Sequence, residues 1–200
     1  MYDVSQLKEA AIAEILHPTL AMTNQILDDH PLDYKDGTPN ISSIDKEDTN
    51  GIVRVYFKFK DEPFDLVIYI SSIPNIEILS VAIEPGTSVY LWIEKPESNV
   101  QIDIPFVPTR TTIKGFEFGP DKNYSNIPEH KINRLLNILD KYKERIKEIA
   151  SITYVSLNIA YHSHKDNMQE IHLDRAMLKR ISELNIELDL DLYASGTTLK

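Results

Sequence analysis

The middle of the chain alternates apolar and polar residues. In "IVRVYFKFK" at 52–60, the valines and phenylalanines at odd positions alternate with arginine, tyrosine and lysine. This period of two predicts a β-strand with one buried face and one solvent-exposed face. Similar apolar runs follow at 64–71, 76–84 and 88–94, and short turns that contain proline separate them. Short connections between consecutive strands predict an antiparallel meander.

The N-terminal segment shows helical spacing instead. Leu7, Ala11 and Ile15 fall on one stripe of a helix, and Pro18 is expected to end a first helix or to open a second one. We therefore expect a kinked or broken helix that covers the buried face of the meander. The text at 30–44 is rich in turn formers, and "DKEDTNG" after it is expected to form an exposed acidic hairpin loop.

The second half of the chain contains further amphipathic segments. A long helix is predicted to begin near Pro128, because proline suits the first helical turn and the following apolar residues recur at helical spacing. A strand at 152–161, a helix at about 173–184 and a strand at 185–193 follow, and Asn185 is expected to end the helix. In the last strand, "NIELDLDLY", we expect the aliphatic residues to enter the core and the carboxylates and Tyr193 to occupy the opposite face.

The order of these elements predicts an α+β fold. One or more N-terminal helices cover an antiparallel β-meander, and a smaller α+β domain with two helices packed on a sheet follows. Two hundred residues suit either one large domain or two domains of about half that length. We place a boundary in "EKPESNVQ" at 94–101, which gives a first domain at 1–96 and a second at 97–200.

The chain is acidic, and the acidity is concentrated at the front. The formal net charge is -10, and the first fifty residues contain ten acidic residues and three basic residues. An acidic surface repels the phosphate backbone of nucleic acids and attracts basic partners. We therefore expect a protein partner with a basic surface and no nucleic-acid partner.

Composition and motifs exclude several classes of protein. The chain has no cysteine, which excludes disulfides, thiolate zinc sites and cysteine nucleophiles. Its apolar runs are too short to span a membrane, and its first residues lack the pattern of a secretory signal, so we expect a cytoplasmic protein with no membrane partner. The six glycines form no phosphate-binding cluster, and we expect no cofactor.

Three stretches of the second half resemble a known family. They are "PTRTTIKG" at 108–115, the amphipathic segment "LLNILDKYKERIKEIA", and "IHLDRAMLKRISELNIELDLDLY" at 171–193. On these stretches, the C-terminal half resembles the bacterial domain of unknown function 4279 family (DUF4279). The resemblance implies an α+β domain, and it implies no activity and no catalytic residue.

The segment "YHSHKDN" at 161–167 is the sharpest chemical candidate. Its His162, His164 and Asp166 are similar to the first half of the metal motif of the metallo-β-lactamase superfamily, and imidazoles with a carboxylate are suitable zinc ligands. That motif has a further histidine where this chain has Asn167, and little sequence remains to supply other ligands. These three residues are therefore candidate metal ligands. The default interpretation of the segment is a solvated turn.

The acids of the last strand are a second chemical candidate. Glu187, Asp189 and Asp191 alternate with aliphatic residues, and alternate residues of a strand lie about 6–7 Å apart, too far for two carboxylates to share a proton. A paired-carboxylate glycosidase also needs an aromatic-lined cleft, and Trp92 is far away in sequence. We interpret the acids as the hydrated face of a core strand, which also discourages edge association.

The acidic N-terminal segment is the candidate for partner binding. Long polar loops in which acids surround an aromatic residue are typical of surfaces where a basic partner docks. The candidate residues are Asp28, Asp29, Asp33, Tyr34, Asp36, Asp45, Glu47 and Asp48. An ordinary solvated loop is the other interpretation of this segment.

These observations lead to a hypothesis about function. A small acidic protein without a catalytic constellation is expected to act by binding, and we predict an immunity protein or antitoxin that neutralises a bacterial toxin domain by direct contact. We predict no catalytic residue. The alternatives are a metal-dependent hydrolase that uses the histidine segment, and a structural or small-ligand-binding module.

Overall fold

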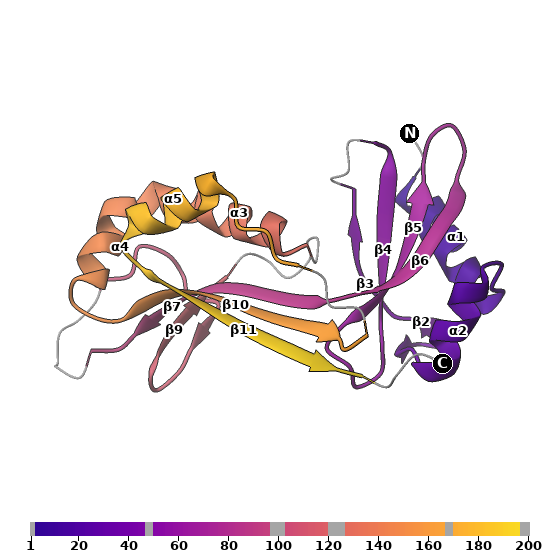
Figure 1. Cartoon of the computed structure of the whole chain (residues 1–200), viewed down its shortest axis with the longest axis horizontal. Coiled ribbons are helices and arrows are strands. Elements are labelled where there is room, and N and C mark those ends of the chain that lie inside the picture. The colour runs from indigo at the N-terminus through magenta and orange to yellow at the C-terminus, as the bar shows by residue number, and fades with distance from the viewer. Residues whose placement is uncertain (1–2, 47–49, 97–102, 120–126, 167–169, 197–200) are drawn as a thin grey trace.

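Two β-sheets organise the chain, and each has helices packed on one face (Figure 1). The computed structural model describes residues 3–46, 50–96, 103–119, 127–166 and 170–196. The predicted α+β class is confirmed, because helices cover antiparallel strands in the first half and a mixed sheet follows in the second. Among the described residues, no helix has the length and apolar composition that crossing a membrane requires.

The first sheet has four antiparallel strands in the order β3-β4-β5-β6. The strands are β3 (Ile41–Asp45), β4 (Ile52–Lys58), β5 (Asp65–Ser71) and β6 (Glu77–Glu84). A two-stranded hairpin precedes this sheet, with β1 at Tyr34–Lys35 and β2 at Thr38–Pro39. Asp36 and Gly37 form its turn with positive φ angles of 53° and 77°, which glycine and aspartate tolerate best. The sequence at 30–44 therefore holds strands as well as the predicted turns.

The predicted break in the N-terminal helix is confirmed. α1 (Val4–Leu16) ends before Pro18, and α2 (Ala21–Asp29) follows. The buried carboxylate of Glu14 accepts hydrogen bonds from the backbone amides of Thr19 and Leu20 at 3.0 and 3.1 Å, so it satisfies donors at the start of α2. Burial raises the pKa of Glu14, but hydrogen bonds from the Thr19 and Thr23 hydroxyls, together with the two backbone bonds, outweigh burial and hold the net pKa below its usual value.

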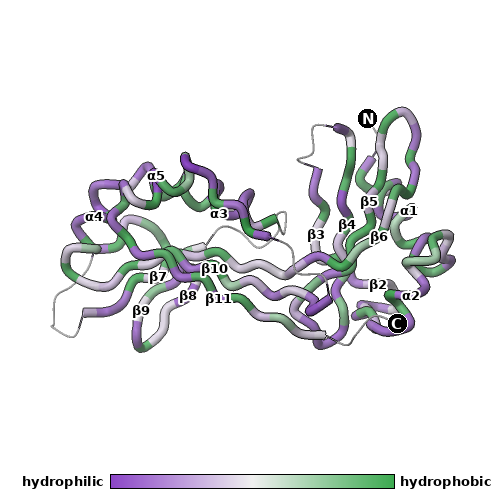
Figure 2. Tube along the Cα trace, viewed as in Figure 1, coloured by the Kyte–Doolittle hydropathy of each residue, from purple (hydrophilic) through white to green (hydrophobic). Residues whose placement is uncertain are grey.

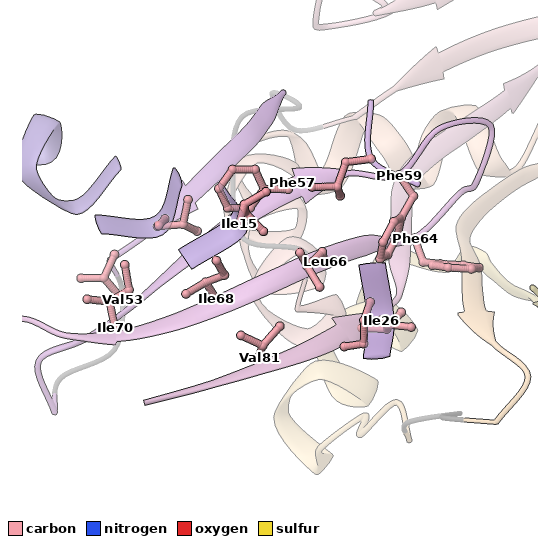
Figure 3. Packing of buried hydrophobic residues seen from close by; sticks show 14 of the residues in the cluster. Ile15, Ile26, Val53, Phe57, Phe59, Phe64, Leu66, Ile68, Ile70 and Val81 are labelled. Carbon is pink, nitrogen blue, oxygen red and sulfur yellow. The ribbon is translucent and has the colours of Figure 1, made fainter. Parts of the chain in front are cut away.

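The helices cover the apolar face of the first sheet, as predicted. Figure 3 shows Ile15 of α1 and Ile26 of α2 beside the inward-facing side chains of β4 and β5. Phe57 and Leu66 are opposite each other in the β4–β5 ladder, and both are completely buried. The apolar contact between these sheet side chains and those of α1 and α2 holds the N-terminal helices on the sheet.

The second sheet has five strands in the order β11-β10-β7-β9-β8. They are β7 (Gly86–Glu94), β8 (Arg110–Thr111), β9 (Gly115–Phe118), β10 (Val155–His164) and β11 (Glu187–Ser195). β10 and β11 are parallel, and every other pair in this sheet is antiparallel. The prediction that residues 88–94 complete the first meander is wrong, because this strand pairs with β10 and β9 in the second sheet.

Three helices cover one face of the second sheet (Figure 1). The long helix expected from Pro128 is divided into α3 (Pro128–Leu139) and α4 (Lys143–Ala150) by a 3-10 turn at Asp140–Tyr142. α5 (Arg175–Leu184) connects the parallel strands β10 and β11, and Asn185 ends it in the left-handed conformation, as predicted. In Figure 2, α4 and α5 contain both hydrophilic and hydrophobic positions, which is typical of helices that cover a sheet.

The last strand is less buried than its sequence pattern predicts. Ile186 and Leu188 are half-buried and pack on the second core, but Leu190 is 47% exposed and Leu192 is 58% exposed. The prediction that all four residues enter the core is therefore wrong for the last two. The physical reason is that β11 lies at the edge of the sheet and runs on beyond α5 (Figure 1).

The chain passes from the first sheet to the second through a single residue, Pro85. β6 and β7 form one extended run, and the proline interrupts the ladder because it has no backbone N–H. The predicted domain boundary at 96 lies beside residues 97–102, which are outside the described ranges, so the division into 1–96 and 97–200 stays a prediction. The change of sheet itself falls earlier, at Pro85.

Buried rings fill the space where the two sheets meet. His164 at the end of β10 packs edge-on against Phe64 and His30 of the first half, with ring centroids 5.5 and 5.1 Å apart. Gly196 lies so close that a Cβ there would be 2.5 Å from the His164 ring. Gly86 approaches the backbone of Pro63, and a Cβ on Gly86 would lie 1.7 Å from the Pro63 carbonyl oxygen.

This close approach predicts that Gly86→Ala destabilises the protein. The added methyl group cannot fit without a backbone shift, because its nearest neighbour is a main-chain oxygen and not a flexible side chain. We expect the free energy of unfolding in urea to fall by about 3 kcal/mol. Ser88→Ala, at an exposed position of the same strand, is the control. Equal unfolding midpoints for the two variants would contradict the packing described here.

Candidate protein-binding face

Most of the predicted acidic residues lie at the surface of the first half. Asp28 and Asp29 end α2, Asp33 precedes β1, and Tyr34 and Asp36 belong to the hairpin. Tyr34 is 52% exposed, and Asp28 and Asp36 are also exposed. Asp33 is half-buried, and its carboxylate accepts a hydrogen bond from the Asn40 amide at 2.7 Å.

The other predicted acids do not extend this surface. Asp45 is only 3% exposed, and its carboxylate pairs with the Arg54 guanidinium at 3.4 Å. A buried, paired carboxylate cannot contact a partner, so the assignment of Asp45 to an exposed loop is wrong. The cause is local: Asp45 is the last residue of β3 and lies opposite Arg54 in the ladder. Glu47 and Asp48 lie outside the described residues.

The histidine segment does not converge on one point. The His162 ring stacks on Tyr193 with centroids 4.6 Å apart and planes inclined by 10°. His164 is 1% exposed, and its Nδ1 accepts a hydrogen bond from the Asp166 backbone amide at 3.2 Å. The two imidazoles therefore have different neighbours, and Asn167 lies outside the described ranges. Where the chain is described, no three histidine, aspartate or glutamate side chains are grouped to hold a metal ion.

One face of the second sheet has no described helix over it (Figure 1). Strand register determines which side chains point to this face, because residues directly opposite each other project to the same side. We call it the open sheet face. Its larger side chains are Tyr90, Trp92, Arg110, Glu117, Tyr154, Asn158, His162, Glu187, Asp189, Asp191 and Tyr193.

Aromatic rings lie among the carboxylates of the open sheet face. Tyr154 and Tyr193 are 42% and 47% exposed, and Trp92 is half-buried. The Trp92 indole lies against Gly115, where a Cβ would come within 2.5 Å of the ring. Gly115 therefore allows the indole to lie flat on the neighbouring strand. The resulting surface offers large, partly exposed rings held in place by the sheet.

Negative charge accumulates around these rings. The Tyr154 hydroxyl donates a hydrogen bond to Asp189 at 2.7 Å, and this bond raises the pKa of Tyr154. Burial raises the pKa of Tyr90, and the charges of Glu117, Asp191 and Asp189 raise it further. Arg110 on β8 offsets one carboxylate, because its guanidinium pairs with Glu117 at 3.3 Å.

A polar cluster occupies the other face of the first sheet, which was expected to be wet. Tyr56 is completely buried there, and the Arg54 side chain is only 18% exposed. The guanidinium of Arg54 lies 5.6 Å from the centre of the Tyr69 ring and 4.0 Å from the Glu84 carboxylate. The Tyr69 hydroxyl also donates to Glu84. Burial raises the pKa values of Tyr56 and Tyr69, and the charge of Glu84 raises them further.

The start of α3 covers part of this polar face and leaves a pocket of about 250 Å³. Arg54, Tyr69 and Glu84 line one side, and Ile127, Pro128 and Glu129 line the other. The charged side chains that reach the pocket from the sheet are Arg54 and Glu84, which pair with each other. Arg54 also pairs with Asp45 of the same sheet. The cluster therefore forms a polar layer between the first sheet and α3, in which Arg54 and Glu84 are paired with each other.

Lys131 of α3 is half-buried next to this layer. Its Nζ donates to the carbonyl oxygen of Thr87 at 2.5 Å. Burial lowers the pKa of Lys131 to about 8, with the nearby Lys58 charge lowering it and Asp65 opposing the change. The amine is thus held in an environment that disfavours its charged form.

The geometry defines an α+β protein with two larger sheets, in which one face that carries acidic and aromatic side chains has no described helix over it. Residues 105–195 match the model of a family described as Domain of unknown function (DUF4279), which confirms the resemblance for that segment. The matched segment contains β8 to β11 but begins after β7, the strand between β10 and β9. No curated protein and no solved structure matches the chain.

Sequence reasoning placed the three acids of β11 and Tyr193 on one outward face and missed the other aromatic residues there, Tyr90, Trp92 and Tyr154. The three acids of β11 do lie on the outer face of a strand, as predicted. Trp92, considered too distant in sequence, lies on the same face, because it pairs with Ser156, which in turn pairs with Glu187. The available signal was "SVYLWIE", in which Tyr90 and Trp92 occupy the outward positions of an alternating strand.

The lowered pKa of Lys131 predicts a rise in stability with pH. The unfolded chain retains the lysine proton up to about pH 10.5, whereas the folded protein releases it near pH 8. Between these values the unfolded state binds more protons, so the free energy of unfolding increases with pH. We expect a gain of about 2 kcal/mol from pH 7 to pH 9.5 that Lys131→Met abolishes.

The measurement is urea unfolding of both proteins across this pH range. Lys141→Met is the control, because Lys141 is exposed and its loss leaves the pH dependence unchanged. The range ends below pH 10, where the raised pKa values of the buried tyrosines act with the opposite sign. Parallel pH profiles for the wild type and Lys131→Met would refute the assignment.

Proposed function

We propose that this chain is a binding protein that neutralises a basic partner protein by direct contact with the open sheet face. The specific form of the proposal is an immunity protein or antitoxin of the bacterial cytoplasm, with a toxin domain as its partner. The observation that carries the proposal is a sheet face with no described helix over it, on which exposed tyrosines lie among Glu187, Asp189 and Asp191. It is the combination of anchoring rings and unbalanced negative charge that supports binding of a basic protein surface.

The two kinds of side chain have different roles in binding. Tyrosine and tryptophan supply large contact areas with few rotatable bonds, and they are enriched among the residues that dominate binding energy. The carboxylates speed association with a basic partner and repel acidic ones. Tyr154 and Asp189 are already hydrogen-bonded to each other, so this part of the face is organised before a partner arrives.

The negative surface continues toward the N-terminal acids. His164 contacts Gly196 after β11, and it also contacts His30, which follows Asp29 directly. The end of β11 therefore lies close to the segment that carries Asp29 and Asp33. A partner seated on the open sheet face would experience the charge of both acidic segments.

The proposal predicts which residues protect cells from a toxin domain encoded beside the gene. Co-expression with the wild-type chain is expected to restore growth, and Asp191→Lys with Tyr193→Ala is expected to abolish the rescue. The double variant removes one anchor and reverses one charge, so the affinity measured by calorimetry falls at least about tenfold.

Two controls make the test specific. Glu144→Lys on α4 reverses a charge away from the open sheet face and is expected to keep full rescue. Asp28→Lys with Asp36→Lys tests the acidic segment of the first half, and we expect partial weakening through slower association. The proposal fails if no neighbouring toxin domain is neutralised, or if the open-face variant protects as well as the wild type.

A further inference from the structure

β11 presents an unpaired strand edge. It is the first strand in the order of the second sheet, its inner edge pairs with β10 over nine residue pairs, and within the described ranges no strand pairs with its outer edge. Alternate residues of an edge strand direct their N–H and C=O groups away from the sheet. This row of donors and acceptors is a template for another strand.

Each side of this edge has its own chemical character. Glu187, Asp189 and Asp191 lie on the open sheet face, and Leu190 and Leu192 lie on the opposite side. These two leucines are 47% and 58% exposed, although they belong to a strand whose first half is covered by helices. A strand that pairs here would meet carboxylates on one side and exposed aliphatic carbons on the other.

A second copy of this chain does not fit the edge. In an antiparallel pair, directly opposite residues project to the same side. If the two copies aligned their faces, the aspartates of one copy would oppose those of the other, which is unfavourable for like charges. A shift by one residue would place aspartates against leucines instead. Registers that align the acidic stretches of two copies are therefore unfavourable, and the acids disfavour self-association at this edge.

A basic amphipathic strand fits where a second copy does not. Lysine or arginine at alternate positions would pair with Asp189 and Asp191, and aliphatic residues between them would cover Leu190 and Leu192. We propose that the outer edge of β11 binds an extended segment of the partner that alternates basic and aliphatic residues. This inference rests on the proposed function, since it names how the basic partner is held.

The size of the open sheet face supports this mode of binding. β7, β10 and β11 each contain nine or ten residues. Their length is about 30 Å and their combined width is about 15 Å, which gives an area of roughly 450 Å². A stable interface buries about 800 Å² on each partner. Pairing along the β11 edge extends the contact beyond the face and adds main-chain hydrogen bonds.

A synthetic peptide tests strand addition without knowledge of the partner. The probe is an acetylated peptide of alternating lysine and valine that matches the nine residues of β11. We expect it to bind the full chain with a dissociation constant below about 100 μM at low salt. Amide hydrogen exchange within Glu187–Ser195 is expected to slow at alternate residues, because the peptide pairs with the outward-facing groups.

Three control peptides separate strand pairing from general charge attraction. One has the same composition in a block order, one replaces lysine with glutamate, and one carries N-methyl groups on the residues that would pair with β11. Each is expected to bind at least about tenfold more weakly than the probe. Equal binding of the block or the N-methylated peptide would overturn the proposal, since such binding needs no strand alignment.

Variants on the leucine side distinguish this inference from the proposed function. Leu190→Ser with Leu192→Ser alters the edge without changing the open sheet face, and it is expected to weaken peptide binding at least about tenfold. Leu178→Ser on α5 is the matched control, because Leu178 is also 47% exposed. If the leucine variants bind the peptide normally, the inference fails, whereas loss of toxin rescue in the open-face variant would still support the proposed function.

Discussion

The close contact between the backbones of Gly86 and Pro63 is the constraint on which the arrangement of the molecule depends. β6 and β7 are one extended run, and only Pro85 separates a strand of the first sheet from a strand of the second. Proline ends one ladder because it lacks a donor, and glycine allows the next strand to begin within contact of the turn between β4 and β5. The buried rings of Phe64, His30 and His164 then fill the same junction from both halves.

The junction decides which surfaces are covered. It brings the start of α3 over the polar face of the first sheet, so Arg54, Tyr56 and Glu84 form an internal layer in which Arg54 pairs with Glu84. The second sheet is arranged differently. Helices cover one of its faces, and the other face has no described helix over it. Charge that is balanced inside the molecule contributes to its packing, whereas the excess negative charge on the open sheet face and on the β11 edge is available to a basic partner.

Local physical chemistry made much of the fold predictable from the sequence. Pro18 divides the N-terminal helices, Pro128 begins α3, and Asn185 ends α5, each because of its own backbone preference. Alternating patterns identified β4 to β7, β10 and β11, and the outward acids of the last strand. Three stretches of the second half also resembled the DUF4279 family, and the family match over residues 105–195 confirms this resemblance.

Only the tertiary structure decided how these elements pair and what covers them. Short turns favoured a meander through residue 94, but β7 binds β10, which is distant in sequence, and no local signal records that choice. This long-range pairing places Trp92 on the same face as Glu187, and the position of β11 at the edge of the sheet leaves Leu190 and Leu192 exposed. A strand's alternation specifies two faces, whereas burial of either face depends on neighbours that come from elsewhere in the chain.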